Sequence, residues 1–289
     1  AVDQQRIGAR SDMRQFYLIN ATGTTYDLNV SSVSILHSVA GLGYSDAVEY
    51  QRIGERFAAV TDNLDQGVIT GVVRFAQPDA YQKYFDFVRF LQSKPLRLKV
   101  VTPVGTFYRR GTATMVDKAE TAPLQCTVTF TATTPYYKVV ARSNDGTSSG
   151  GKIYDYTYDY TYADDIPGTI NISSDSYADP GSPAKLTIFG PVTDPTWRHY
   201  VDGDLVATGA VHVTVPDGRK LVIDSTTIPY QIMQYDLQNN LVADDYQLSD
   251  FTTARFLRLR HGLNSVAVSQ DGSAIPAIAL EAEVEYASV

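Results

Sequence analysis

The segment that decides the fold covers residues 77–95 and reads QPDAYQKYFDFVRFLQSKP. Apolar or aromatic residues recur in it at the three-and-four spacing of one helical face: Tyr81, Tyr84, Phe85, Val88 and Leu91. Pro78 suits a first helical turn, and Pro95 ends the segment because proline lacks the amide donor that a helix needs. The segment therefore predicts a helix, the one convincing helix of the chain.

Alternating apolar residues predict strands on both sides of this helix. After the helix, apolar residues fall at every second position in two runs: Leu96, Leu98 and Val100, then Leu124, Cys126, Val128 and Phe130. Before it, residues 16–39 predict a hairpin broken at residues 22–24, and residues 67–75 predict a further strand. One helix among such strands indicates an α+β unit built on an antiparallel sheet.

Composition limits the functions that the chain can have. Its 289 residues are enough for two domains, and its 44% hydrophobic content without an apolar run of about 20 residues predicts a soluble protein without a signal peptide. A net charge of -8 argues against a surface that grips nucleic acid. The single cysteine, Cys126, excludes an internal disulfide, and its apolar register predicts a buried, inert thiol.

The composition changes after Tyr136. Residues 141–152 are polar and rich in Gly and Ser, which predicts a flexible domain boundary. Beyond it, tyrosines occupy every second position, so that an extended strand would place their rings on one side as an interface: Tyr154, Tyr156, Tyr158, Tyr160 and Tyr162. Residues 169–289 contain short alternating runs between turn signals, which predicts an all-β sandwich.

Candidates for chemistry are weak. Residues 146–150 (GTSSG) have the letters of a nucleophile elbow around Ser148, as in a secreted hydrolase, but lack its strand-turn-helix context. The four histidines show no metal-ligand spacing, so we expect no enzyme, no metal and no cofactor. Trp197 and Tyr200 could stack on sugar rings, although aromatic residues are more often part of a core or an interface.

The order of these parts resembles the distal tail protein family of long, non-contractile-tailed bacteriophages. The resemblance rests on a series of short segments: 38–43 (SVAGLG), 74–78 (RFAQP), 134–137 (TPYY), 154–160 (YDYTYDY), 188–197 (IFGPVTDPTW), 201–203 (VDG), 220–225 (KLVIDS) and 256–266 (FLRLRHGLNSV). The chain departs from the family at Asp194 and Asp202, where asparagine is common, and in the tyrosine run, where relatives often carry prolines in place of the aspartates.

The resemblance implies a mainly β protein with one helix. Residues 1–141 would form an N-terminal α+β ring-forming domain built on antiparallel sheet. Residues 142–167 would form a flexible, tyrosine-rich linker, and residues 168–289 a galectin-like β-sandwich. The chain would then be a structural virion component at the tail tip, assembled in the cytoplasm of the bacterial host. Six copies would form a ring that joins the tail tube to the host-adhesion device.

The implied partners are other copies of the chain, the major tail tube protein, a tail-associated hub protein, and receptor-binding or other baseplate proteins. DNA would pass through the channel without specific binding, and no membrane insertion is implied. We also hypothesise that the acidic balance of the chain extends to the inner wall of the ring, where it would repel DNA. The alternative is a carbohydrate-binding module that recognises host cell-wall polysaccharide.

Overall fold

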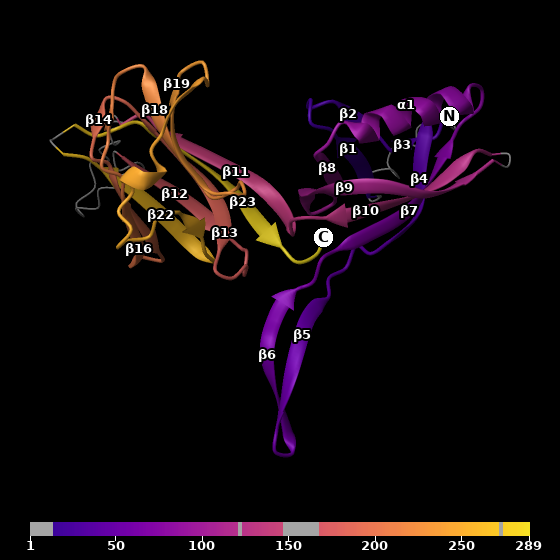
Figure 1. Ribbon diagram of the computed structural model, residues 1–289, viewed down its shortest axis with the longest axis horizontal. Helices are drawn as coiled ribbons and strands as arrows, with labels where there is room; N and C mark the ends of the chain where they lie inside the picture. The colour runs from indigo at the N-terminus through magenta and orange to yellow at the C-terminus, as the bar shows by residue number, and fades with distance from the viewer. Residues whose placement is uncertain (1–13, 121–122, 147–167, 272–273) are drawn as a thin grey trace, which may run out of the picture. The chain divides into compact units, whose positions relative to one another are not determined.

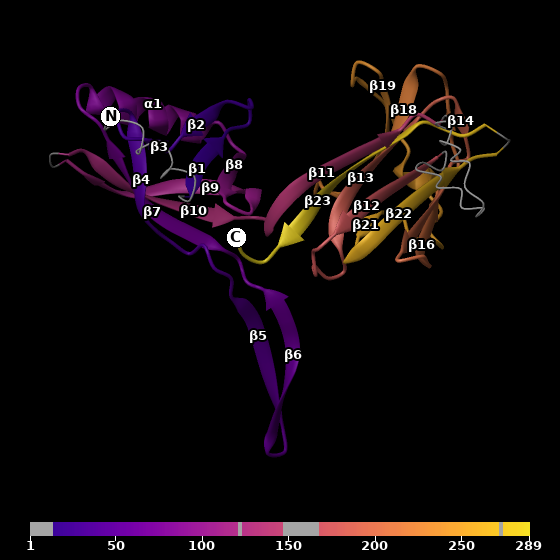
Figure 2. The same ribbon diagram turned by 180° about the vertical axis from the view of Figure 1, so that it is seen from behind.

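The computed structural model describes residues 14–120, 123–146, 168–271 and 274–289 (Figures 1 and 2). The chain divides into two compact units: unit 1 comprises residues 1–138 and 286–289, and unit 2 comprises residues 139–285. The predicted mainly β class with one α-helix is confirmed over the described ranges. Within these ranges no helix has the length and apolar character that a membrane span requires.

Unit 1 is an antiparallel sheet with one helix, α1 (Ala80–Gln92). Its strands are β1 (Gln15–Ile19), β2 (Thr25–Asp27), β3 (Asn29–Val30), β4 (Ser34–Ala40), β5 (Asp46–Ile53), β6 (Arg56–Leu64), β7 (Val68–Phe75), β8 (Leu96–Thr102), β9 (Gly105–Ala119) and β10 (Gln125–Ala132). The long strand β9 pairs with β8 through its first half and with β10 through its second half. The resulting order is β2-β1-β8-β9-β10-β7-β4-β3, while β5 and β6 pair only with each other.

Helix α1 lies along one face of this sheet (Figure 1). The ring of Phe87 is fully buried, with its centroid 4.8 Å from that of Tyr26 and 5.8 Å from that of Phe75. The predicted helical face is partly wrong, because Tyr81 and Phe85 are exposed. Aromatic residues occur on two neighbouring faces of this helix, and only packing against the sheet selects the face that is buried.

The predicted strands of unit 1 are confirmed. The apolar positions of β8 and β10 are buried as their alternation predicts. The hairpin broken at residues 22–24 is the antiparallel pair β1 and β2. Cys126 is buried, and this burial raises the pKa of its thiol to about 11, so the thiol is protonated and inert at neutral pH as predicted.

Residues 286–289 complete unit 1 from the far end of the described chain. The ring of Tyr286 packs edge-on against that of Phe107, with centroids 5.4 Å apart. Arg14 donates a hydrogen bond of 3.2 Å to the carbonyl oxygen of Val289. Sequence patterns did not predict this return, because a four-residue segment carries no periodic signal. Strands β11 (Tyr136–Asn144) and β23 (Ile278–Tyr286) each contain residues of both units.

Unit 2 contains two larger antiparallel sheets, ordered β12-β22-β15-β16 and β20-β19-β18-β13-β23-β11, and the separate two-stranded pair β14-β17. Its strands are β12 (Thr169–Ser174), β13 (Ser182–Phe189), β14 (Val192–Thr193), β15 (Thr196–Val201), β16 (Asp204–Ala210), β17 (Thr214–Val215), β18 (Arg219–Asp224), β19 (Gln231–Asp236), β20 (Leu241–Asp244), β21 (Arg258–Leu259) and β22 (Gly262–Ser269), with a 3-10 turn at Tyr246–Leu248. Alternate residues of both sheets are buried, which agrees with the predicted β-sandwich. Its galectin-like form stays a prediction.

Trp197 belongs to the interior of unit 2. The side chain is only 1% exposed, and its neighbour across the β15–β16 pair is Gly209. A Cβ atom on Gly209 would lie 2.4 Å from the indole, so only glycine leaves room for the ring. Trp197 and Gly209 therefore fit each other as parts of one core.

A buried histidine is hydrogen-bonded to one of the segments that carry the family resemblance, residues 256–266. The Nε2 atom of His199 lies 2.9 Å from the Oδ1 atom of Asn264, whose amide donates to the carbonyl oxygens of Arg260 and Gly262. Nearby, Asp202 accepts a 2.8 Å hydrogen bond from the backbone of Leu263. Burial lowers the pKa of His199, with a smaller contribution from the charge of Arg260.

Replacing Trp197 with alanine should lower the free energy of unfolding by about 3 to 5 kcal/mol, because the large core side chain leaves a cavity. Denaturant unfolding of the full chain, followed by circular dichroism, measures the change. The exposed neighbour Arg198 provides the control, since Arg198→Ala should change stability by less than about 0.5 kcal/mol. A loss for Trp197→Ala as small as that of the control would place the indole outside the core.

The neutral imidazole of His199 should make stability depend on pH. Because its pKa is lower when folded, its stabilising contribution is fully present above the ordinary value of 6.5 and is lost as the pH falls through the folded pKa. Thermal melts between about pH 7 and pH 5 should therefore show a steeper fall for the wild-type chain than for His199→Gln. Parallel curves for the two proteins would contradict this assignment.

Candidate assembly interface

Strands β5 and β6 form a two-stranded hairpin, here named the arm (residues 46–64), which extends away from the rest of unit 1 (Figures 1 and 2). These residues carry no pattern from which an element was predicted. In the described part of the chain, the arm pairs with no other strand. A lone two-stranded ribbon is only marginally stable in water, so the arm stands to gain stability from contacts outside its own chain.

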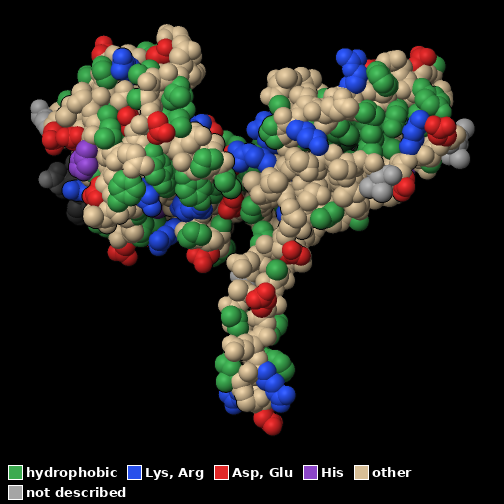
Figure 3. All heavy atoms as spheres, in the orientation of Figure 1, with side chains coloured by type: hydrophobic (Ala, Val, Ile, Leu, Met, Phe, Trp, Pro, Cys, Tyr) green, Lys and Arg blue, Asp and Glu red, His purple; other side chains and the backbone are tan. Residues whose placement is uncertain are grey.

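One face of the arm is mostly apolar. Residues directly opposite each other in an antiparallel pair share a face, and here Tyr50 lies opposite Ala59 and Arg52 opposite Phe57. By this register the face named here the apolar arm face contains Val48, Tyr50, Phe57, Ala59 and Leu64, together with the charged residues Asp46 and Arg52. Tyr50 is 65% exposed and Phe57 is 69% exposed, and Figure 3 shows hydrophobic side chains along the arm. Contiguous exposed apolar surface of this kind marks an interaction site.

The opposite face of the arm is mostly polar. It contains Ala47, Glu49, Gln51, Ile53, Arg56, Ala58, Thr61 and Asn63. A shift in register next to Glu49 and Tyr50 gives β6 one extra residue, Val60, so the apolar positions do not alternate strictly along the sequence. This bulge explains why the alternation of residues in the sequence did not predict the arm. The available signal was the short alternation of Val48 with Tyr50 and of Phe57 with Ala59 around the turn at Gly54.

The root of the arm is tightly fixed on the side of β4. Gly41 has a φ of +81°, and a Cβ atom there would lie 2.0 Å from the carbonyl oxygen of Val68. Only glycine allows both this left-handed backbone and the close approach of the chain to β7. Gly41 therefore has a structural role where the chain leaves the sheet for the arm.

A buried arginine fixes the other side of the root. The side chain of Arg109 is 3% exposed, its Nε atom donates a 2.8 Å hydrogen bond to the carbonyl oxygen of Thr134, and its guanidinium lies 4.6 Å from the centroid of the Tyr136 ring. A Cβ atom on Gly67 would lie 2.1 Å from the guanidinium. Burial raises the pKa of Tyr136, so a neutral ring faces the cation.

A second exposed apolar patch lies on α1. Tyr81 and Phe85 are four residues apart, share one side of the helix and are both more than half exposed. The ammonium of Lys118 lies 4.9 Å from the centroid of the Tyr81 ring. This helix patch, formed by Tyr81 and Phe85, is separate in sequence from the apolar arm face. Unit 1 therefore offers two distinct apolar patches to partners.

The residues singled out from the sequence do not form one site. Tyr154, Tyr156, Tyr158 and Tyr160 lie outside the described residues, so their interface role stays a prediction, and Ser148 also lies outside them. The structure argues against Trp197 and Tyr200 as a sugar platform, because the Trp197 indole is buried and the two residues lie on opposite faces of β15. Among the residues with described positions, no three His, Cys, Asp or Glu side chains gather as a metal site would require.

Residues 15–133 match the family model described as distal tail protein, N-terminal domain. In fold, the chain is similar to a chain of the phage p2 baseplate in its activated conformation with Sr, at a TM-score of 0.63 and 14% identity, with 96% of this chain and 100% of that chain covered. The same baseplate with Ca gives a TM-score of 0.63 at 15% identity, with the same coverage.

A further similar structure is that of SPP1 Dit, described as a paradigm of the hub adsorption apparatus in phages that infect Gram-positive bacteria. Its TM-score is 0.59 at 12% identity, with 93% of this chain and 98% of that chain covered. A search of curated protein sequences gave no significant match. The resemblance to the distal tail protein family that the sequence suggested is confirmed over residues 15–133, which match the N-terminal domain of that family.

Proposed function

We propose that six copies of this chain close into a ring at the tail tip and that the ring joins the tail tube to the host-adhesion device. The observation that carries the proposal is the arm, whose apolar face is exposed in the isolated chain. The match of residues 15–133 to the N-terminal domain of distal tail proteins supports a place in the virion as a structural component. Assembly would take place in the host cytoplasm before the virion is released.

A ring of rotationally related copies requires two complementary patches on each chain, because every copy contacts one neighbour with its first patch and the other neighbour with its second. Unit 1 has two candidates for these patches, the apolar arm face and the helix patch. In the proposed ring, the arm of one copy packs on the helix patch of the next copy. Burial of Tyr50 and Phe57 at this contact would stabilise both the ring and the arm.

The two units would have different tasks in this assembly. Unit 1 is the ring-forming domain, since it contains both patches and the residues that match the family model. Unit 2 is the peripheral sandwich, available to baseplate or receptor-binding partners. The two openings of the ring would contact the tail tube protein and a tail-associated hub protein. None of these contacts needs a catalytic group, which fits a structural role.

The distribution of charge between the units removes the basis of the acidic-wall hypothesis. Unit 1 contains 15 Lys and Arg residues against 12 Asp and Glu residues, for a formal net charge of +3. Unit 2 contains 9 against 20, for a net charge of -11, so the acidic balance of the chain belongs to unit 2. An inner wall built from unit 1 would not share the net negative charge of unit 2. The passage of DNA would therefore depend on which side chains line the channel.

Ring formation should depend on the apolar arm face. The double variant Tyr50→Ser/Phe57→Ser should fold with a free energy of unfolding within about 1 kcal/mol of wild type, since both side chains are exposed. It should fail to form the six-fold annulus that electron microscopy would show for wild type, assembled alone or with the tail tube protein. The control is Ile53→Ser on the opposite face of the arm, which removes an equally exposed apolar side chain and should leave the ring intact.

Mixing two variants tests the proposed pairing of the patches. Phe85→Ser should also prevent ring closure, yet an equimolar mixture with the arm variant should form dimers, because one intact arm face still meets one intact helix patch. Analytical ultracentrifugation distinguishes monomer, dimer and ring. Rings formed by Phe85→Ser alone would exclude α1 as the receiving surface, and rings formed by the arm variant would overturn the role of the arm.

A further inference from the structure

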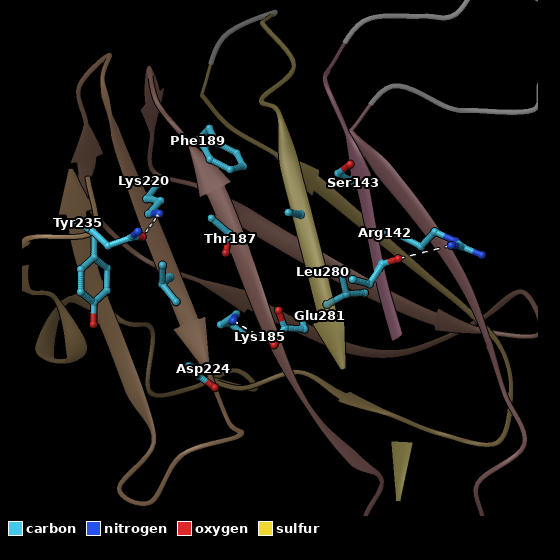
Figure 4. Close-up of a pocket in the computed structure, with 14 residues that line it drawn as sticks. Arg142, Ser143, Lys185, Thr187, Phe189, Lys220, Asp224, Tyr235, Leu280 and Glu281 are labelled. Atoms are coloured by element: carbon cyan, nitrogen blue, oxygen red, sulfur yellow. Dashed lines mark hydrogen bonds and ion pairs between the residues drawn. The ribbon is translucent and has the colours of Figure 1, made fainter. Parts of the chain in front are cut away.

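The outer face of one sheet of unit 2 is hollowed into a groove of about 530 Å³ (Figure 4). It crosses β19, β18, β13, β23 and β11, so at about 4.8 Å per strand it is roughly 19 Å long. This volume lies within the usual range of ligand sites. The lining residues all belong to unit 2, and neither the ring contacts proposed above nor the family assignment involves this groove.

The register of the strands gives the groove a floor between two walls. Thr187 of β13 lies opposite both Val222 of β18 and Ala279 of β23, so small side chains form the floor. Lys185 and Phe189 stand two residues to either side of Thr187 on the same face of β13. At about 3.3 Å per residue, the two walls are roughly 13 Å apart, which leaves room for one extended chain across the strands.

One wall offers hydrogen-bond donors and acceptors side by side. Lys185 lies opposite Asp224 on one side and Glu281 on the other, and its ammonium is 3.2 Å from a carboxylate oxygen of Glu281. The carboxylate of Asp224 accepts two hydrogen bonds from Thr226 through one oxygen. Alternating donors and acceptors of this kind match hydroxyl groups, which both donate and accept.

The other wall is cationic and aromatic. Lys220 lies opposite Phe189 and Tyr235, and its ammonium donates a 2.6 Å hydrogen bond to the neutral amide oxygen of Asn239. Arg142 stands at the β11 end of the groove and is exposed. With Lys185, these residues place three of the nine basic residues of unit 2 in one groove, although the unit carries a net charge of -11. A local excess of cations on an acidic unit favours an anionic ligand.

We propose that this groove binds an acidic oligosaccharide or polyol chain, one that carries carboxylate or phosphate groups between hydroxyl groups. The Lys185 wall would bond the hydroxyls, Lys220 and Arg142 would meet the acidic groups, and the ring of Phe189 would contact the apolar face of a sugar. An acidic peptide fits less well, because its backbone amides would face the methyl groups of Val222 and Ala279 without partners.

Calorimetric titration of the full chain tests the proposal with three probes of equal length: an oligomer of hexuronic acid, an oligomer of glycerol phosphate and a neutral glucose oligomer. We expect saturable binding of at least one acidic probe, about tenfold tighter than that of the neutral probe and weakened by added salt. The two acidic probes distinguish carboxylate from phosphate recognition. Absence of binding by both at about 10 mM, or equal binding of the neutral probe, would overturn the proposal.

Variants locate the site. Lys220→Glu should weaken binding of the acidic probe at least about tenfold, and Thr187→Trp should abolish it by filling the floor of the groove. The matched controls are Arg198→Glu and Thr208→Trp, cross-strand neighbours on the other sheet whose side chains point away from the core. Both controls should bind as wild type does, and thermal melts should show that all four variants fold. Equal losses for Lys220→Glu and Arg198→Glu would mean that net charge alone attracts the probe.

Discussion

Packing of α1 on the antiparallel sheet is the contact on which unit 1 depends. The ring of Phe87 packs against the rings of Tyr26 in β2 and Phe75 in β7. Because a sheet of this kind must bury one face, the helix supplies that cover and the buried residues of β1, β8, β9 and β10 complete the core. No described element of the chain covers the arm in this way. Its apolar face is consequently left for a partner.

The same sheet also determines how firmly the arm is held. Gly41 and Gly67 let the backbone approach β7 and the guanidinium of Arg109 at distances that no Cβ atom allows. Arg109 is held in turn by the carbonyl oxygen of Thr134 and the ring of Tyr136. A long ribbon with an exposed face is useful in assembly only when its base is rigid, since a loose base would add an entropic cost to every contact.

In unit 2 the core and the groove use different side chains. Trp197 and the pair of His199 and Asn264 are buried between its strands, so they fix the fold and offer nothing to a ligand. The outer face of the other sheet carries the charges instead, and its groove concentrates cations on a unit that is acidic as a whole. The surface features that carry the two proposals therefore lie on different units: two apolar patches on unit 1 and a charged groove on unit 2.

The sequence by itself determined the features that repeat along the chain. The alternation in β8 and β10, the helix between two prolines and the order of family segments were sufficient for the class, the single helix and the family, because each is written in local spacing. Four features came only from the tertiary structure: the helical face that is buried, the burial of Trp197 away from any sugar, the existence of the arm, and the set of strands that form the groove. Those features depend on register and on contacts between distant segments, which the spacing of residues along one strand or helix does not contain.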